Sequence, residues 1–389
     1  MWKRSETDRR RVKIVDFQHL AYSYMNGGAP KLSTTLTIDG VPTILDTTIP
    51  AYSLKWLHNL SDYGFNPIIV CFDSKGSSLS RKAYFERFKV EVDGDAPLTI
   101  DGYKAHRESS NNDFYEGINK TAYYLQKAKV PIAKCLGYEA DDLVFASIQR
   151  AKEQYPDLPI DVYTGDADLI PLVDEQVSVF LRSRTTTYAV SKDIEKKHYV
   201  QLTPESYATY VNNLTVFKTI DTPYNSVLLA KLLRGDKSDL ICAKKDWKPK
   251  KYNELLYTLV ADGYDIGNLF RYGAYKKELW YRDTCQPIPE HLIDSTPKEN
   301  KIIHFGEPEE LTHMCEVLSH YVEPIDIIHI KHVYHGINLN ACYKVGNNPG
   351  EVPDMFKRRP AEISADIKGY DQILLAQAAA ELQIKIPIK

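Results

Sequence analysis

The chain has 389 residues, and at about 150 residues per domain this length predicts two domains with elaborations. Its 49 Lys and Arg residues against 52 Asp and Glu residues leave a net charge of −3, which excludes a protein that binds nucleic acid through overall positive charge. A hydrophobic content of 43% is enough to bury a sizeable core, so global disorder is excluded as well.

The six cysteines are scattered and include no CxxC pair, a usage typical of a reducing compartment rather than of a disulfide-stapled domain. The first residues are charged, and no uncharged apolar run approaches the roughly 18 residues needed to span a bilayer. We therefore expect a cytoplasmic protein with no membrane partner, in the host cytoplasm if the source is viral.

Three short apolar runs are each followed by an acidic residue: Val12–Val15 by Asp16, Pro67–Phe72 by Asp73, and Pro159–Tyr163 shortly before Asp166. Segments with helical spacing of apolar residues lie between them, for example 52–60 and 143–148. Strands that alternate with helices predict a parallel sheet, in which functional sites lie at the carboxyl ends of the strands. The three carboxylates are therefore expected at one edge of an α/β fold.

A long segment between Lys75 and Thr121 breaks this alternation of strands and helices. A segment of this length between core elements is usually functional or disordered. It interleaves basic with aromatic residues, namely Arg81, Lys82, Arg87, Lys89, Lys104 and Arg107 with Tyr84, Phe85, Phe88 and Tyr103. After about Asn225 the pattern becomes largely helical, with 309–322 and 371–383 as amphipathic helices.

Acidic residues in five clusters carry the predicted chemistry: Asp16; Asp73; Glu139, Asp141 and Asp142; Asp166 and Asp168; Asp236 and Asp239. Most of these clusters lie among apolar or small residues, which is costly unless cations neutralise them. Oxygen donors without His or Cys at ligand spacing favour Mg²⁺ or Mn²⁺ over zinc. Two such ions about 3.5 to 4 Å apart can activate water and stabilise the leaving oxygen of a phosphodiester.

The spacing within two of the clusters predicts where their side chains point. Glu139 and Asp142 can share one face at the start of a helix, and Asp166 and Asp168 can point the same way from an extended strand end. Taken alone, Glu139 or Asp168 is better explained as a helix cap or a solvated acid. That alternative loses weight because every strand identified in the sequence ends in an acid.

The motifs GYEADDL, YTGDADLIPLV and RGDKSDL, with the earlier VDFQHL and the FD of CFDSKG, resemble in order the acidic motifs of the 5′-nuclease superfamily, the flap endonucleases and bacteriophage 5′→3′ exonucleases. The resemblance runs from Ile14 to Asp239. It implies a PIN-like α/β core with two divalent ions and a helical arch through which a single-stranded 5′ end passes. It also implies that all nine acids above are metal ligands, directly or through water.

The sequence GYKAHR resembles the signature at the base of that arch, which implies that Tyr103, Lys104 and Arg107 contact the scissile region of the substrate. The residues suit this role by themselves. Lys104 and Arg107 lie one helical turn apart and can grip neighbouring phosphates, and Tyr103 offers a face to an unpaired base. An ordinary basic helix edge with a packed tyrosine is an equally good interpretation without the acidic context.

Cellular members of the superfamily follow the last acidic pair with a Gly-rich hairpin that binds a monovalent cation, whereas this chain has no glycine between Gly235 and Gly263. A lysine cluster stands there instead, and we predict that it binds DNA together with Arg81 and Lys82. Its members are Lys244, Lys245, Lys248, Lys250 and Lys251. The alternative is a solvated turn, which lysine runs most often form.

The expected architecture is a PIN-like nuclease core over 1–224 with an arch at about 75–121, a helical duplex-binding region over 225–344, and a C-terminal extension over 345–389. The expected function is a Mg²⁺- or Mn²⁺-dependent 5′ nuclease acting on branched, nicked or 5′-ended DNA in replication or repair. An RNase H-type nuclease for RNA primers and a non-catalytic DNA-binding scaffold are the alternatives. The extension could dock a replication protein.

Overall fold

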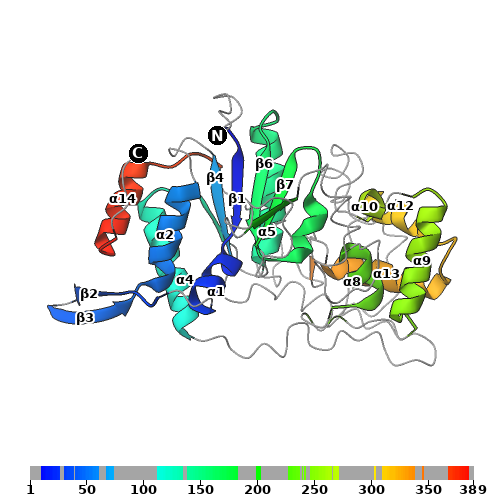
Figure 1. Ribbon diagram of the computed structural model, residues 1–389, viewed down its shortest axis with the longest axis horizontal. Coiled ribbons are helices and arrows are strands. Elements are labelled where there is room, and N and C mark those ends of the chain that lie inside the picture. Colours follow the sequence, from blue (N-terminus) through cyan, green and yellow to red (C-terminus); the bar gives the residue numbers. More distant parts are fainter. Residues whose placement is uncertain are drawn as a thin grey trace.

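The computed structural model (Figure 1) describes residues 10–26, 30–38, 40–60, 67–73, 112–134, 138–182, 199–202, 227–236, 239, 241, 246–264, 266–270, 302–303, 309–337, 344–345 and 367–384. No helix within these ranges is long and apolar enough to cross a membrane.

A six-stranded sheet forms the centre of the fold, with the strand order β5-β4-β1-β6-β7-β8. Its strands are β1 (Val12–Asp16), β4 (Ile68–Phe72), β5 (Ile132–Lys134), β6 (Ile160–Thr164), β7 (Val177–Arg182) and β8 (Tyr199–Leu202). The first five strands are parallel, and β8 pairs antiparallel with β7. The expected α/β fold and the three strands predicted from sequence are therefore confirmed.

Side chains of the central strands alternate between two hydrophobic clusters, as the two-residue period of a strand requires. In β1, Val12 and Ile14 face the first cluster and Val15 faces the second. In β4, Ile69 faces the first cluster and Val70 the second. A sheet with both faces buried explains why these strands are continuous apolar runs rather than alternating ones.

Four helices cover the face of the sheet that belongs to the second cluster (Figure 1). They are α1 (Phe17–Asn26), α2 (Thr48–Leu60), α4 (Asn112–Lys127) and α14 (Gln372–Glu381). Because α4 begins at Asn112 and packs on α2, residues 112–121, which the sequence pattern assigned to the basic insertion, form the first part of a core helix. Residues 74–111 lie outside the described part of the chain.

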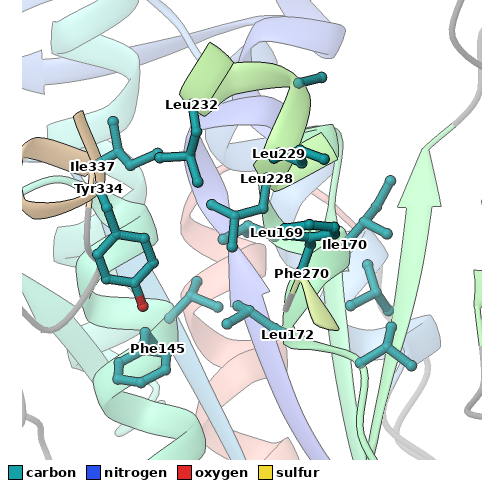
Figure 2. Packing of buried hydrophobic residues seen from close by; sticks show 14 of the residues in the cluster. Phe145, Leu169, Ile170, Leu172, Leu228, Leu229, Leu232, Phe270, Tyr334 and Ile337 are labelled. Atoms are coloured by element: carbon teal, nitrogen blue, oxygen red, sulfur yellow. The ribbon is translucent and has the colours of Figure 1, made fainter. Parts of the chain in front are cut away.

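The opposite face is covered by α5 (Ala140–Gln154), and the hydrophobic cluster on this face extends to elements from Ala167 onward. These elements are the 3₁₀ helix η2 (Ala167–Leu172) and the helices α8 (Val227–Arg234), α9 (Pro249–Ala261), α10 (Ile266–Leu269), α12 (Glu309–Leu318) and α13 (Pro324–Ile337). Figure 2 shows Leu228 and Leu232 of α8 beside Leu169 of η2. The predicted core and helical region thus share one hydrophobic cluster.

The last described residues, 367–384, pack against elements from the first part of the chain. Lys368 forms a β-bridge with Ile68 at the start of β4, and the Tyr370 hydroxyl donates a 3.3 Å hydrogen bond to the carbonyl of Leu57. Helix α14 then packs against α2 and α4 with its apolar side. The apolar face of this part of the predicted extension is therefore packed against the protein's own core.

Two short ribbons were not predicted from the sequence. The first pairs β2 (Ser33–Ile38) with β3 (Val41–Asp46) and projects from the body of the protein (Figure 1). The second pairs β9 (Ile302–Ile303) with β10 (Lys344–Val345). The hairpin of β2 and β3 is tied down at its base, where the Thr34 hydroxyl donates a 3.0 Å hydrogen bond to the carbonyl of Leu382 after α14.

Candidate metal centre

The site begins where the order of the parallel strands reverses. From β1 the chain runs outward to β4 and β5, and then returns to place β6 on the other side of β1. Such a reversal opens a crevice at the carboxyl ends of the two adjacent strands. Asp16 ends β1, and Thr164 ends β6 directly beside it. The Thr164 hydroxyl donates a 2.7 Å hydrogen bond to Asp16 Oδ2 and accepts a 2.9 Å bond from the Asp166 amide.

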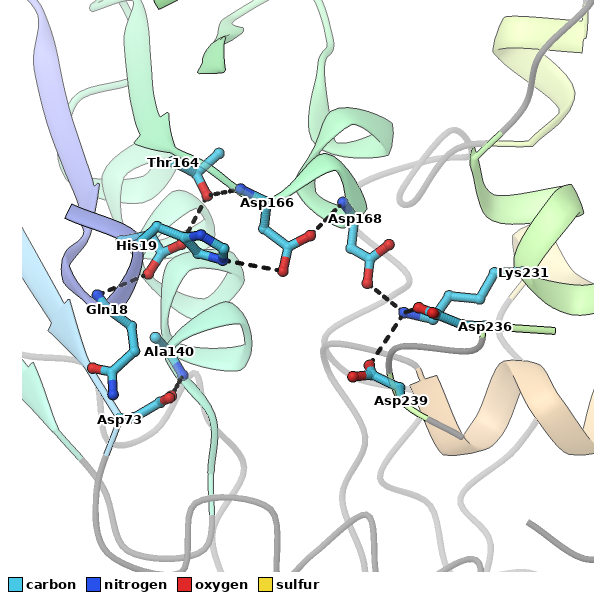
Figure 3. Close-up of polar contacts among 11 residues, drawn as sticks. Gln18, His19, Asp73, Ala140, Thr164, Asp166, Asp168, Lys231, Asp236 and Asp239 are labelled. Carbon is cyan, nitrogen blue, oxygen red and sulfur yellow. Dashed lines mark hydrogen bonds and ion pairs between the residues drawn. The ribbon is translucent and has the colours of Figure 1, made fainter. Parts of the chain in front are cut away.

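His19 is a site residue that the sequence argument missed. It lies one turn into α1, and its Nε2 is 3.4 Å from Asp166 Oδ2, as Figure 3 shows. The imidazole sits against Gly165, where an added Cβ would approach His19 Nδ1 to 2.9 Å. The signal was the three-residue spacing from Asp16, which on a helix that follows directly from the strand turns the ring back toward the sheet edge.

Charge couples these three side chains. Burial raises the pKa of the Asp16 carboxyl above its ordinary value, and the nearby His19 only partly opposes this. Burial would lower the pKa of His19, but Asp16 and Asp166 outweigh it and raise the value to about 10. Burial likewise opposes ionisation of Asp166, but the hydrogen bond and charge of His19 hold the pKa of Asp166 well below its usual range. The group is therefore a histidine paired with Asp166 beside the buried Asp16.

The geometry of Asp166 and Asp168 differs from the extended strand end predicted from sequence. Strand β6 ends at Thr164, and Asp166 is the N-cap of the 3₁₀ helix η2, with its Oδ1 accepting a 2.9 Å bond from the Asp168 amide. The extended conformation predicted for this segment is wrong, because a 3₁₀ turn follows Asp166. Asp166 faces His19, whereas Asp168 faces α8 (Figure 3).

The acids of GYEADDL are arranged at the start of α5 as the spacing predicted. Glu139 is the N-cap and forms a capping box with Asp142, whose Oδ2 accepts a 3.0 Å bond from the Glu139 amide. Asp73, just after β4, accepts a 2.6 Å bond from the amide of Ala140. The helix-cap interpretation of Glu139 is thus correct. Capping satisfies one oxygen of a buried carboxylate and leaves its second oxygen available to a cation.

A second group of acids gathers around Lys231 of α8. Carboxylate oxygens of Asp168, Asp236 and Asp239 lie within 4.8 Å of one another. Lys231 Nζ forms an ion pair with Asp168 and lies 3.1 Å from Asp236 Oδ2 and 3.5 Å from Asp239 Oδ2. Figure 3 shows the ammonium between the three carboxylates. Lys231 was not predicted as a site residue from the sequence. It lies in the last turn of α8, five residues before Asp236.

The chain after α8 is folded so that it presents these acids. Gly235 adopts a φ of 68°, a conformation that glycine reaches without strain at the end of a helix. Asp236 and Ile241 then exchange two backbone hydrogen bonds of 2.9 and 2.8 Å, which close the turn that carries Asp239. The motif RGDKSDL is therefore a helix stop followed by a tight turn with its two aspartates near the sheet edge.

These three carboxylates, which we name the aspartate trio, fit a divalent cation. Burial raises the pKa of Asp168 to about 6 even though Lys231 opposes the shift. The single ammonium therefore compensates the three negative charges incompletely. A donor set made only of carboxylate oxygens suits a hard ion such as Mg²⁺ or Mn²⁺.

All nine acids predicted from sequence lie among the described residues, but most of the predicted DNA contacts do not. Tyr103, Lys104, Arg107, Arg81, Lys82, Lys244 and Lys245 lie outside the described part of the chain. Lys248 is the N-cap of α9, and Lys251 Nζ stands 4.4 Å from the centre of the Trp247 ring. Lys250, 89% exposed, lies 3.9 Å from Glu254. These three lysines thus lie at the start of α9 rather than in a solvated turn.

Residues 11–199 match the family model described as the 5′-3′ exonuclease, N-terminal resolvase-like domain. This part of the chain is therefore similar to a 5′-3′ exonuclease N-terminal domain, and the family resemblance carried by the acidic motifs is confirmed. The matched residues include β1, β4, β5, β6 and β7 of the sheet and seven of the nine predicted acids, and they end at the first residue of β8.

Known relatives share this domain at moderate identity. A thermostable DNA polymerase I from Thermus filiformis is 27% identical over 201 residues, covering 52% of this chain and 20% of that protein. A 5′-3′ exonuclease from Mycoplasma pneumoniae is 27% identical over 195 residues, covering 50% of this chain and 53% of that protein. The chain thus spans about a fifth of the polymerase and about half of the exonuclease.

Among solved structures, the T5 D15 protein co-crystallised with metal ions aligns over 96% of this chain and 98% of its own, at 14% identity and a TM-score of 0.46. Human GEN1 in complex with Holliday junction DNA aligns over 64% of this chain and 49% of its own, at 10% identity and a TM-score of 0.34.

Proposed function

We propose that this protein is a divalent-metal-dependent, structure-specific 5′ nuclease that hydrolyses phosphodiesters at 5′ ends, flaps or nicks. The observation that carries the proposal is the gathering of carboxylates at the carboxyl edge of the parallel sheet, within a 5′-3′ exonuclease N-terminal domain. A DNA-binding scaffold without activity would be expected to have lost some of these acids. This chain keeps all nine.

Two Mg²⁺ or Mn²⁺ ions held by the nine acids, directly or through water, are part of this proposal. Bound divalent ions would supply an activated water and stabilise the leaving oxygen. The protein's own contribution is a set of fixed carboxylates. Thr164 orients Asp16, His19 balances the charge of Asp166, and the turn after α8 holds Asp236 and Asp239 near Asp168.

The proposed substrate is branched, nicked or 5′-ended duplex DNA. Lys104 and Arg107 would grip phosphates near the cleaved bond, and Tyr103 would stack on an unpaired base. The lysine cluster with Arg81 and Lys82 would hold the duplex arm through its phosphates. Docking of a replication protein through the C-terminal extension is a separate part of the proposal.

Cleavage of 5′-labelled flap, nicked and RNA-primed duplexes in Mg²⁺, Mn²⁺ or EDTA tests the proposal. We expect products from the DNA flap and nick substrates in either metal and none in EDTA. A protein that binds these substrates without cutting any of them would be a scaffold. Cleavage confined to the RNA-primed duplex would instead indicate an RNase H-type nuclease.

A further inference from the structure

Lys231 makes more contacts than a structural ion pair requires. Its ammonium reaches one carboxylate oxygen from each member of the aspartate trio, and the side chain is only 9% exposed. Another partly buried ion pair joins Lys152 of α5 to Asp174. An ammonium with three donor hydrogens can satisfy three carboxylates at once. The Lys231 ammonium therefore occupies the position that a monovalent cation would take among three carboxylates.

We propose that Lys231 is a built-in cation that holds the aspartate trio together in the metal-free protein and competes with a divalent ion for the same carboxylates. The inference rests on the proposed function, because it takes Asp168, Asp236 and Asp239 as metal ligands. It goes further because it assigns to Lys231 control over how tightly an ion binds to the aspartate trio.

Competition follows from charge and from the number of available oxygens. An ammonium and a divalent ion repel each other at contact distance in a partly buried site. The three carboxylates that Lys231 contacts are also the ones that would hold the ion. The flexible four-carbon stem of lysine allows the ammonium to withdraw when an ion enters. Binding at the aspartate trio is then weaker than the three carboxylates alone would provide.

Binding of Mn²⁺ to the intact protein, measured by electron paramagnetic resonance of the free ion, tests this competition. We expect Lys231→Met to tighten Mn²⁺ binding at the aspartate trio by about tenfold or more, since the competing charge is gone. Lys231→Arg keeps the charge and should not tighten it. Lys152→Met, which removes a similarly buried lysine outside the site, should leave Mn²⁺ affinity unchanged. Equal or weaker Mn²⁺ binding in Lys231→Met would overturn the inference while leaving the metal site in place.

Absence of Mn²⁺ binding in every variant, wild type included, would instead overturn the proposed metal-dependent function and this inference with it. A second measurement uses only the wild-type protein and so does not depend on the folding of a variant. Acetic anhydride labelling of Lys231, compared with Lys152 by mass spectrometry, should rise several-fold when Mn²⁺ replaces EDTA. General stabilisation by metal would lower labelling at both lysines, so constant or reduced labelling of Lys231 contradicts displacement.

Discussion

Thr164 and Asp16 join the ends of two neighbouring parallel strands through a 2.7 Å hydrogen bond between the Thr164 hydroxyl and Asp16 Oδ2. Both side chains are buried, so the carboxylate cannot replace this donor with water. The bond fixes the acid at the point where the sheet order reverses, and every other side chain of the site is arranged around it.

Thr164→Val should lower the free energy of unfolding by about 1 to 3 kcal/mol, because it leaves the buried Asp16 short of one donor at nearly constant volume. Thr164→Ser keeps the hydroxyl and should lose less. Urea unfolding in EDTA measures both changes. If Val and Ser cost the same, the loss arises from packing and the hydrogen bond has no role in stability.

Asp168→Asn should raise the stability of the metal-free protein at pH 7 by about 1 to 2 kcal/mol, since burial makes ionisation of Asp168 unfavourable. Asp166→Asn should lower stability, because Asp166 loses its charged partner His19. The double variant should abolish cleavage while DNA binding and the fold persist. Thermal unfolding in EDTA and a flap-cleavage assay test this pair, and near wild-type cleavage by the double variant would refute the proposed metal role of these acids.

The pairing of His19 with Asp166 predicts a stability that depends on pH. The folded-state pKa of His19 is raised above its ordinary 6.5 to about 10, so its contribution is complete below pH 6.5 and is lost as pH rises toward 10. The pKa of Asp166 is lowered from 3.8, so its contribution is present above that pH and is lost in acid. The stability that the pair contributes is therefore complete between about pH 4 and 6.5.

Replacing His19 with Gln should flatten the decline of unfolding free energy above pH 6.5 relative to the wild type. The His19 side chain is 42% exposed, so water screens the pair and the decline should be complete well below pH 10. Chemical denaturation in EDTA between pH 6 and 9 measures the difference. Parallel wild-type and His19→Gln curves would show that the imidazole is not charged in the folded protein.

The lysine cluster predicts strong dependence of duplex binding on salt and none on the identity of the monovalent ion. Each phosphate contact adds about 0.9 to the slope of log K against log salt. Alanine at all five lysines should flatten that slope by about two to four. Lys250→Ala alone should account for more of the change than Lys251→Ala, because Lys251 stacks on Trp247. A preference for K⁺ over Na⁺ at fixed ionic strength would indicate a bound ion instead.

Leu375→Ala should lower the free energy of unfolding by about 2 to 5 kcal/mol, because the side chain is fully buried in the second cluster, to which α2 and α4 contribute. Ile373→Ala on the same helix is the matched control, since Ile373 is 53% exposed and should change stability little. Equal effects of the two substitutions would mean that α14 does not stabilise the core in solution.

Three strands of the sheet and the place of most of the acids could be predicted from the amino-acid sequence. Apolar runs such as Pro67–Phe72 are long enough to be buried on both faces, and an acid after each run must lie at the same edge when the strands are parallel. The local geometry of the GYEADDL motif could be predicted as well, because a helix cap and its partner three residues later are neighbours along the chain.

Which charged side chains contact one another could be learned only from the tertiary structure. Asp168 and Lys231 are 63 residues apart, and no periodic pattern relates two side chains that a chain reversal brings together. The same limit applies to the return of residues 367–384 to β4 and α2, which rests on contacts across some 300 residues. Asp166 and Asp168 lie before and in η2, which packs against β7 and α8, and this packing overrides the extended conformation that their spacing alone predicted.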